Sequence, residues 1–337
     1  MAEVSAGHQR NAREVMAATR PMAEDDPAKS WWYVATTLTI MTGLLGIAAA
    51  APWWPVRLVA SVFGALVMVR MFILYHDFMH GSILRRSLLA RVVLLSYGYL
   101  VLVPARSWRF SHNFHHAHPG IPSDASAGSF PLLTTDMWRE ASWLKRARYR
   151  FSRHPIIILC AYITVFAYSL TIEAFLENPK KNWDSLLAIA VHSALVAGVW
   201  WFGGFEMAFF AVILPMIVAS MIGAYLFYVQ HNFVGMRIVP GEEWSNYQAS
   251  LDSCSFLRVG PIMRWFTGDI GYHHVHHLNA AIPFYRLEET MAAVPELQHP
   301  VETSLTLKDI LACLRLKLWD TRSGKMLTYA QARQLAS

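Results

Sequence analysis

Three short histidine clusters are the residues of this 337-residue sequence whose types and spacing could do chemistry. They read His76-Asp-Phe-Met-His80, His112-Asn-Phe-His115-His116-Ala-His118 and His273-His274-Val-His276-His277. Neutral imidazole is the commonest metal ligand among side chains, and spacings of three and four residues place imidazoles on one face of a helix. Each cluster lies beside a long apolar stretch or in the segment that follows one. The pattern predicts a nitrogen-rich metal site at the edge of a membrane.

Eight or nine imidazoles exceed the needs of a single metal ion. Zinc takes about four protein ligands in structural sites and about three plus water in catalytic sites, so these clusters are sufficient for two metals with open positions. Imidazole suits zinc, copper, iron and nickel alike, and the residue types alone do not choose among them. His231 follows the last apolar run and is one more candidate ligand. Asp77 could orient a ligand imidazole through the second ring nitrogen.

The composition is that of an integral membrane protein. Hydrophobic residues make up 55% of the chain and charged residues 15%, against about 25% charged in soluble proteins. The net charge of +6 comes from basic residues that flank apolar runs, which indicates a membrane-facing cytoplasmic surface and argues against a nucleic-acid partner. Cys160, Cys254 and Cys313 form no CxxC pair, and the sequence has no dinucleotide fingerprint or P-loop. A redox reaction would therefore draw its electrons from another protein.

Six apolar runs approach the ~20 residues that a spanning helix needs. They cover residues 34–54, 58–75, 88–104, 155–176, 184–202 and 205–228. A single crossing between His80 and His112 would place the first two clusters on opposite sides of the membrane. Lys and Arg bracket both ends of runs 88–104 and 155–176, so by the positive-inside rule both ends of each run are cytoplasmic. We expect these two runs to dip into the membrane or lie along its surface.

The predicted fold is an all-α integral membrane protein with four transmembrane helices in two hairpins, interfacial or re-entrant helices, and a cytoplasmic helical cap that carries a di-metal site. Residues 1–30 are polar and lack the apolar core of a signal peptide, so both termini are expected in the cytoplasm. Residues 31–337 form a single domain in this prediction. Its spans are expected at 34–54, 58–75, 184–202 and 205–228, and its cap at about 105–154 and 234–337.

The clusters resemble the signature of the membrane-bound fatty acid desaturases, whose three histidine boxes have the forms HxxxH, HxxHH and HxxHH. The third box continues Leu278-Asn-Ala-Ala-Ile-Pro-Phe-Tyr285-Arg-Leu287, which is similar to the bacterial and plastid-type acyl desaturase branch. The segment Leu226-Phe-Tyr-Val-Gln-His231 is similar to a motif of the same branch. The resemblance covers roughly residues 30–290. Phe78-Met79 departs from it, because the family usually has a small residue before the second histidine of the first box.

This resemblance implies an enzyme with a non-haem di-iron centre that uses dioxygen to introduce a cis double bond into a lipid- or thioester-linked acyl chain. A ferredoxin, or a small haem cytochrome with its reductase, would supply electrons, and a bacterial inner membrane would be the location. By position, the resemblance implies nine iron ligands: His76, His80, His112, His115, His116, His231, His273, His276 and His277. His274 and His118 lie outside the core pattern, and His274 and Asp77 are candidates for supporting the ligands.

Two other readings compete with a desaturase. A membrane hydroxylase or ketolase acting on an alkyl, sterol or carotenoid substrate would use the same centre, because both reactions begin by abstracting a hydrogen atom. The context of His231 and Tyr285 favours desaturation. A histidine-rich metal transporter predicts ionisable residues along a path through the spans. The span centres are instead almost purely apolar, with His192 as the exception, so the transporter reading is disfavoured.

Overall fold

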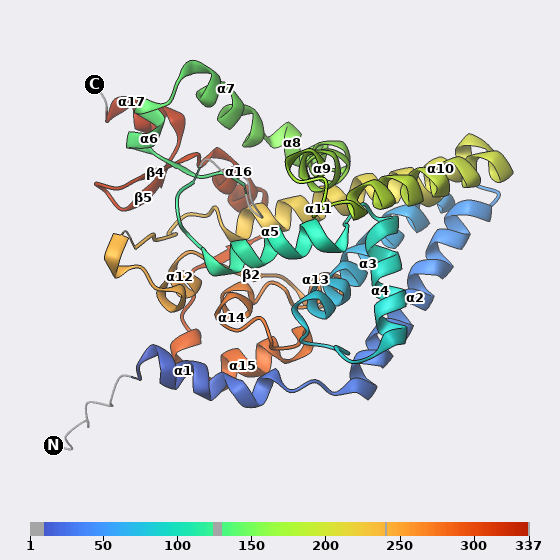
Figure 1. Ribbon diagram of the computed structural model, residues 1–337, viewed down its shortest axis with the longest axis horizontal. Helices are drawn as coiled ribbons and strands as arrows, with labels where there is room; N and C mark the ends of the chain where they lie inside the picture. The colour runs from blue at the N-terminus through green and yellow to red at the C-terminus, as the bar shows by residue number, and fades with distance from the viewer. Residues whose placement is uncertain (1–9, 124–129, 240, 336–337) are drawn as a thin grey trace.

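Two helical hairpins extend from one end of the molecule, and a cap made of shorter elements lies at the other end (Figure 1). The computed structural model describes residues 10–123, 130–239 and 241–335. Residues 1–9 of the predicted N-terminal segment, and 124–129, 240 and 336–337 of the predicted cap, lie outside the described residues. Within the described part of the chain, three helical runs are long and apolar enough to cross a membrane: Pro27–Ala50, Trp54–His80 and Asp184–Gln230. The predicted helical membrane fold is confirmed.

The first hairpin consists of α2, Pro27–Ala50, and α3, Trp54–His80. Asp26 begins α2 because its carboxylate accepts hydrogen bonds from the backbone N–H groups of Ala28 and Lys29. Gly81 ends α3 because its φ of 76° is left-handed, which glycine adopts without strain. Both helices are longer than the apolar runs that predicted them, since α2 begins seven residues before 34 and α3 continues five residues past 75.

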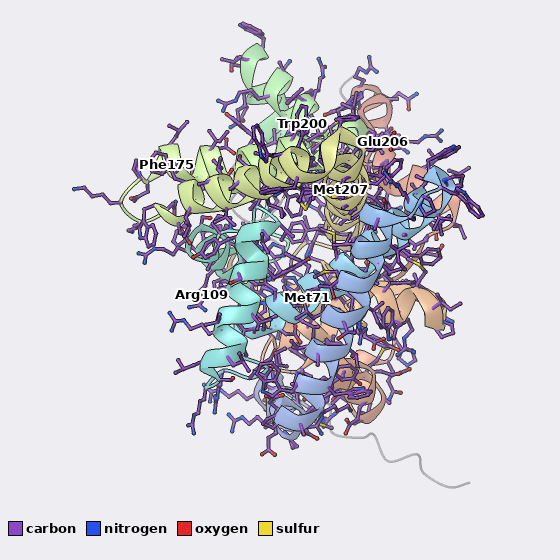
Figure 2. All side chains as sticks on the ribbon, turned by 90° about the vertical axis from the view of Figure 1, so that its right-hand side faces the viewer. Met71, Arg109, Phe175, Trp200, Glu206 and Met207 are labelled. Atoms are coloured by element: carbon purple, nitrogen blue, oxygen red, sulfur yellow. The ribbon has the colours of Figure 1, made fainter. Side chains whose placement is uncertain are left out.

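The second hairpin is the 47-residue run Asp184–Gln230. A straight helix of that length would measure about 70 Å, more than twice the ~30 Å of a bilayer core. Gly204, with φ 74° and ψ 178°, breaks the run and lets it fold back. Arg57 of the first hairpin pairs with Glu206 at 3.1 Å, so the two outer turns lie side by side. Figure 2 shows Trp200 and Glu206 at this end of the molecule. The run comprises α10, Asp184–Ala208, the π-helix η3, Phe209–Ile213, and α11, Leu214–Gln230.

The apolar run 88–104 does not make a net crossing. It forms α4, Leu88–Leu100, which is followed by α5, Ala105–Ala117, at an angle of 90°. The segment between His80 and His112 begins and ends at one place, because Nε2 of His80 lies 3.0 Å from Nε2 of His112. A segment that returns to its starting point crosses a membrane an even number of times, and the 13 residues of α4 reach only about 20 Å. The run is therefore re-entrant or interfacial.

The same reasoning applies to run 155–176. His115 and His231 lie 2.9 Å apart, and the two arms of the second hairpin already account for two crossings between them. The run therefore adds none. It folds as α8, Pro155–Leu159, the π-helix η2, Tyr162–Glu173, and α9, Ala174–Glu177. Figure 2 shows Phe175 at the far tip of this segment, away from the hairpin turns.

The cap packs on the inner ends of both hairpins and contains two small sheets that the sequence analysis did not predict. In one, β1, Leu133–Thr134, pairs in parallel with β4, Leu318–Asp320, which pairs antiparallel with β5, Lys325–Leu327. In the other, β2, Phe256–Arg258, runs parallel to β3, Glu302–Ser304. Strands of two or three residues are too short to leave an alternating pattern in the sequence.

The other helices in the described part of the chain are short and belong mostly to the cap. They are α1, Ala12–Thr19; η1, Arg20–Ala23; α6, Thr135–Glu140; α7, Trp143–Ser152; η4, Gly241–Glu243; α12, Asn246–Asp252; α13, Pro261–Thr267; α14, His273–Leu278; η5, Phe284–Arg286; α15, Leu287–Ala293; η6, Pro295–Leu297; α16, Leu307–Arg315; and α17, Tyr329–Gln334. The largest buried apolar cluster joins α2, α3 and α4 to the segment 266–297 of the cap. One continuous core therefore holds the hairpins and the third histidine box together.

Candidate metal centre

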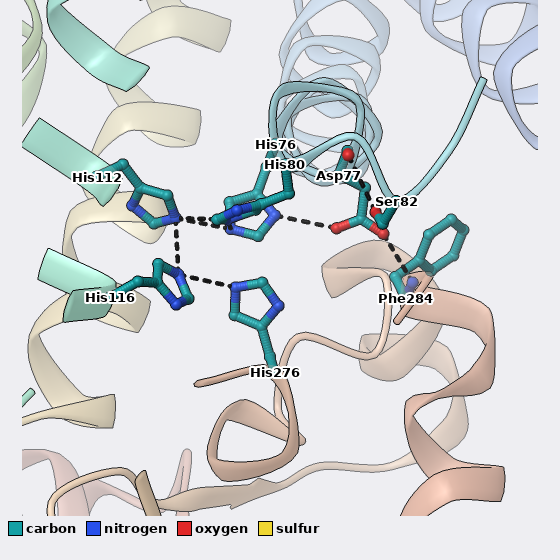
Figure 3. A network of polar contacts seen from close by, with 8 residues as sticks. All are labelled: His76, Asp77, His80, Ser82, His112, His116, His276 and Phe284. Carbon is teal, nitrogen blue, oxygen red and sulfur yellow. Dashed lines mark hydrogen bonds and ion pairs between the residues drawn. The ribbon is translucent and has the colours of Figure 1, made fainter. Parts of the chain in front are cut away.

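Five histidines from three helices direct their Nε2 atoms to one point (Figure 3). Nε2 of His112 lies 3.0 Å from that of His76 and 3.0 Å from that of His80. Nε2 of His116 lies 3.1 Å from that of His112 and 3.1 Å from that of His276. We call this set the five-histidine group; it comprises His76, His80, His112, His116 and His276. Its members come from the last turn of α3, from α5 and from α14.

Four further histidines form a second set, which we call the four-histidine group: His115, His231, His273 and His277. Nε2 of His231 lies 2.9 Å from that of His115 and 2.8 Å from that of His273. Neither ring nitrogen of the buried His277 has a hydrogen-bond partner among the described residues. A buried polar group normally has a partner, so an orphaned imidazole beside three others fits a metal ligand.

The two groups are neighbours because the HxxHH boxes are divided between them. His112 and His116 belong to the five-histidine group, while His115, between them on α5, belongs to the four-histidine group. On α14 the division is reversed, since His273 and His277 join the four-histidine group and His276 the other. The rings of His116 and His277 stack with centroids 4.1 Å apart, so the two groups touch. This arrangement suits a pair of adjacent metal ions.

The nitrogen separations fit metal coordination better than hydrogen bonding. A neutral imidazole carries a single N–H, so five converging Nε2 atoms cannot all be paired with one another. With metal–nitrogen bonds of about 2.1 Å, ligands at right angles stand about 3.0 Å apart and tetrahedral ligands about 3.4 Å apart. Six of the seven contacts, at 2.8–3.1 Å, are nearer the separation of ligands at right angles, and the contact between His76 and His80, at 3.3 Å, is nearer the tetrahedral one. Burial holds the pKa values of His273, His276 and His277 well below the ordinary histidine value, which keeps these rings in the neutral, ligand form.

Two ligand candidates are oriented by partners at Nδ1. Oδ1 of Asp77 lies 3.0 Å from Nδ1 of His76, and Oδ2 of Asp77 accepts from the backbone N–H of Phe284 at 2.7 Å (Figure 3). The carbonyl oxygen of Ser253 lies 3.2 Å from Nδ1 of His231. An acceptor at Nδ1 fixes the tautomer and directs the lone pair of Nε2 into the site. Asp77 thus contacts one of the two rings of the first box that it was expected to support.

The structure separates His274 and His118 from both groups. His274 is buried, and its Nε2 lies 3.1 Å from the carbonyl oxygen of Leu297, on the far side of α14 from the ligand candidates. Its place is in the packing of α14 against the segment that follows α15. His118 is exposed, and its Nδ1 lies 2.9 Å from the carbonyl oxygen of Phe114. Both residues lie outside the two groups in the described part of the chain.

Several residues around the site carried no recognisable sequence signal. Trp108 is buried and stacks on His112 with ring centroids 4.3 Å apart. Sγ of Cys254 lies 3.8 Å from Nδ1 of His231. The contacts from Ser253 and Phe284 use backbone atoms, which any residue type supplies. Only the position of Trp108 four residues before His112, on one helix face, could have indicated its role.

A cavity reaches the four-histidine group from the cap. Its wall includes His115, His231 and Phe227 on one side, and Arg153 and Asn232 on another. Arg153 is buried and donates to the carbonyl oxygen of Pro131 at 2.7 Å and to Oδ1 of Asn232. Phe78 and Met79, the residues of the first box that depart from the family pattern, lie away from this cavity. Both are buried in the main core, and Sδ of Met79 lies 3.8 Å from the guanidinium of Arg109.

Comparison with known proteins agrees with this geometry. A sequence model described as fatty acid desaturase matches residues 51–305. A fatty acid desaturase of Bacillus subtilis is 30% identical over 282 residues, which cover 82% of this chain and 79% of that protein. An sn-1 oleoyl-lipid 12-desaturase of Picosynechococcus is 23% identical, covering 82% of this chain and 80% of that protein. A chloroplastic sn-2 acyl-lipid omega-3 desaturase (ferredoxin) of Helianthus annuus is 26% identical, covering 81% and 63%. The chain therefore belongs to the fatty acid desaturase family.

Proposed function

We propose that this protein is an oxygen-dependent fatty acyl desaturase whose two histidine groups each hold one iron ion. The observation that carries the proposal is the division of nine converging imidazoles into two adjacent groups. In this proposal His76, His80, His112, His116 and His276 bind one ion, and His115, His231, His273 and His277 bind the other. Each set leaves at least one position of a six-coordinate ion open for oxygen or water.

The choice of iron rests on geometry and on the reaction. Ligands at right angles are expected of a six-coordinate ion, whereas zinc in structural sites is tetrahedral. Non-haem iron supplies the oxygen chemistry that removes hydrogen from an unactivated methylene group, which zinc cannot supply because it has no redox states. The carboxylate of Asp77 and the carbonyl of Ser253 hold His76 and His231 in the ligand tautomer. The buried Trp108 stacks on His112 with ring centroids 4.3 Å apart, and the ring of Tyr75 packs against Trp108 with centroids 5.6 Å apart.

The proposed reaction balances with one external donor. The acyl chain loses two hydrogen atoms and gains a cis double bond, while dioxygen, two electrons and two protons complete the formation of two water molecules. The sequence has no flavin, nicotinamide or cluster motif, so a ferredoxin, or a small haem cytochrome with its reductase, is the proposed source of electrons. The name of the Helianthus relative specifies ferredoxin, which supports the first of these donors.

The proposed substrate is an acyl chain carried by a membrane lipid or a thioester. The names of two relatives, from Picosynechococcus and Helianthus, specify acyl-lipid substrates. Basic residues flank the membrane runs on the side of the cap, so we propose that the cap and both termini face the cytoplasm of a bacterial inner membrane.

Expression in a host that lacks the activity, together with a compatible ferredoxin, tests the proposal. Mass spectrometry of total fatty acids should detect new monoenes or dienes, and purified protein should contain about two iron ions per chain. His115→Ala should abolish the product while leaving expression intact. Hydroxy fatty acids in place of alkenes would establish the competing hydroxylase. Absence of any new lipid with either type of donor, together with one equivalent of zinc, would refute the di-iron desaturase.

A further inference from the structure

The segment before the first hairpin lies across the third histidine box (Figure 1, where α1 lies beside α15). Nε of Arg10 donates to Oε1 of Glu296 at 2.8 Å at one end of this contact. In the middle, the side-chain amide of Asn279, which follows α14, donates to Oγ1 of Thr19 at 3.0 Å. Residues 10–26 therefore pack against the cap as an ordered part of it. From their sequence, these residues were expected only to be polar.

Asp25 connects three separate parts of the chain. Its Oδ2 accepts from the backbone N–H of Leu84, in the turn after the first histidine box, at 2.7 Å. Its Oδ1 accepts from the hydroxyl of Tyr285, eight residues after the last histidine of the third box, at 3.0 Å. The same oxygen accepts from Oγ of Ser30, at the start of α2, at 2.5 Å. One carboxylate thus ties the exits of two histidine boxes to the entry of the first span.

The segment Phe284–Arg286 is held at each of its residues. The backbone N–H of Phe284 donates to Asp77, the partner of His76. The hydroxyl of Tyr285 donates to Asp25, and the ammonium of Lys29 lies 4.5 Å from the centre of its ring. The guanidinium of Arg286 donates to the carbonyl oxygens of Pro21 at 2.9 Å and Glu24 at 3.2 Å. These contacts give the Ile-Pro-Phe-Tyr sequence a physical role, although none of its residues belongs to either histidine group.

We propose that Asp25 and Tyr285 are positioning residues of the five-histidine group, forming a clasp that holds the end of α3 against α14. His76, His80 and His276, three of the five members, come from the two helices that the clasp joins. The four-histidine group has two members on α14, His273 and His277, but none on α3, so a shift of α3 against α14 changes the ligand spacing only within the five-histidine group. Opening the clasp should therefore weaken metal binding mainly at the five-histidine group.

The inference rests on the proposed two-metal function, and three variants test it. Asp25→Asn and Tyr285→Phe each remove part of the clasp with little change in volume. Glu24→Gln is the matched control, because the carboxylate of Glu24 is exposed and forms no hydrogen bond or ion pair among the described residues. Purified proteins are loaded with iron and dialysed against a series of chelator concentrations, and metal content and the Mössbauer spectrum are then measured.

We expect both clasp variants to lose one iron at about a 10- to 100-fold lower chelator concentration than the unaltered protein, with the second iron retained. The Mössbauer signal of one site should disappear first, and kcat should fall while KM for the acyl substrate stays unchanged. Glu24→Gln should match the unaltered protein. Two irons retained at unaltered affinity in Tyr285→Phe and Asp25→Asn, or equal loss from both sites, would overturn the clasp.

Hydrogen exchange separates this inference from the proposed function. If the unaltered protein holds fewer than two irons, the two-metal proposal fails by itself. The clasp is then tested by amide hydrogen exchange in the metal-free protein. Exchange in residues 278–290 should be faster in Tyr285→Phe than in the unaltered protein, but not in Glu24→Gln. Unchanged exchange in that segment would refute it. Circular dichroism checks that each variant is folded before either measurement.

Discussion

Replacing Asp77 with asparagine tests how far one buried carboxylate maintains the metal centre. Asp77 offers an oxygen to each of two donors, Nδ1–H of His76 and the backbone N–H of Phe284. Asparagine has nearly the same shape but only one oxygen, because the second is replaced by an NH₂ group that can only donate. One of the two donors must therefore face another donor inside the protein.

The size of the effect follows from burial. Asp77 is 1% exposed, so water cannot replace the lost acceptor. A buried donor left unsatisfied costs about 1–3 kcal/mol. If Phe284 loses its partner, the loss falls on the stability of the metal-free protein. If His76 loses its partner, iron affinity at the five-histidine group falls by about 10- to 100-fold, equivalent to about 1.4–2.8 kcal/mol.

Two measurements on one preparation distinguish these outcomes. Chelator competition gives the affinity of each iron, and thermal unfolding of the metal-free protein gives the change in stability. Ser61→Ala is the control, because the buried Ser61 lies on the same helix, α3, donates through its hydroxyl to the backbone carbonyl of Arg57 at 2.7 Å, and is about four helical turns away from His76. That variant should leave iron affinity unchanged. If Asp77→Asn alters neither affinity by more than about twofold nor stability by more than about 0.5 kcal/mol, the orienting role of Asp77 is refuted.

Three further predictions concern the other ligands, pH and topology. His231→Ala should leave about one iron per chain by elemental analysis, since it removes a member of only the four-histidine group, and two retained irons would contradict that assignment. Burial lowers the pKa values of His273, His276 and His277, so the unfolded chain binds more protons than the folded one below about pH 6.5. The Tm of the metal-free protein should therefore fall as the pH drops from about 7 to about 5. A Tm that does not change with pH would contradict this. The topology can be tested with single cysteines in a Cys160→Ser background, which removes the exposed native thiol. Trp201→Cys, at the turn of the second hairpin, should react with a membrane-impermeant maleimide in intact cells, whereas Trp143→Cys, on the cap, should react only after lysis. The opposite labelling would reverse the proposed orientation.

The sequence was sufficient to predict that the three histidine boxes and His231 meet. The histidine spacing places the rings of each box on one helix face, and the positions of Lys and Arg place the boxes on one side of the membrane. The sequence was not sufficient to divide the histidines between two groups. His115 and His276 hold the same position in two identical HxxHH boxes, yet they belong to opposite groups. The division depends on how α5 and α14 face each other, which is a tertiary property. The contacts from Asp25 to Leu84 and from Asp77 to Phe284 involve backbone N–H groups and were likewise beyond sequence reasoning.

The histidine groups also constrain how the membrane segments can be arranged. His80 and His112 meet within 3.0 Å, and so do His115 and His231, although apolar runs separate each pair in the sequence. Each intervening segment must therefore cross the membrane an even number of times, whatever its hydropathy. This explains why α4 and η2 can be as apolar as spanning helices without crossing, since burying their apolar faces at the interface does not require passage to the other side. A change that turned α4 into a full crossing would separate the first box from the second and leave the five-histidine group with members on both sides of the membrane. The convergence of the histidines therefore constrains the topology of this chain more tightly than hydropathy does.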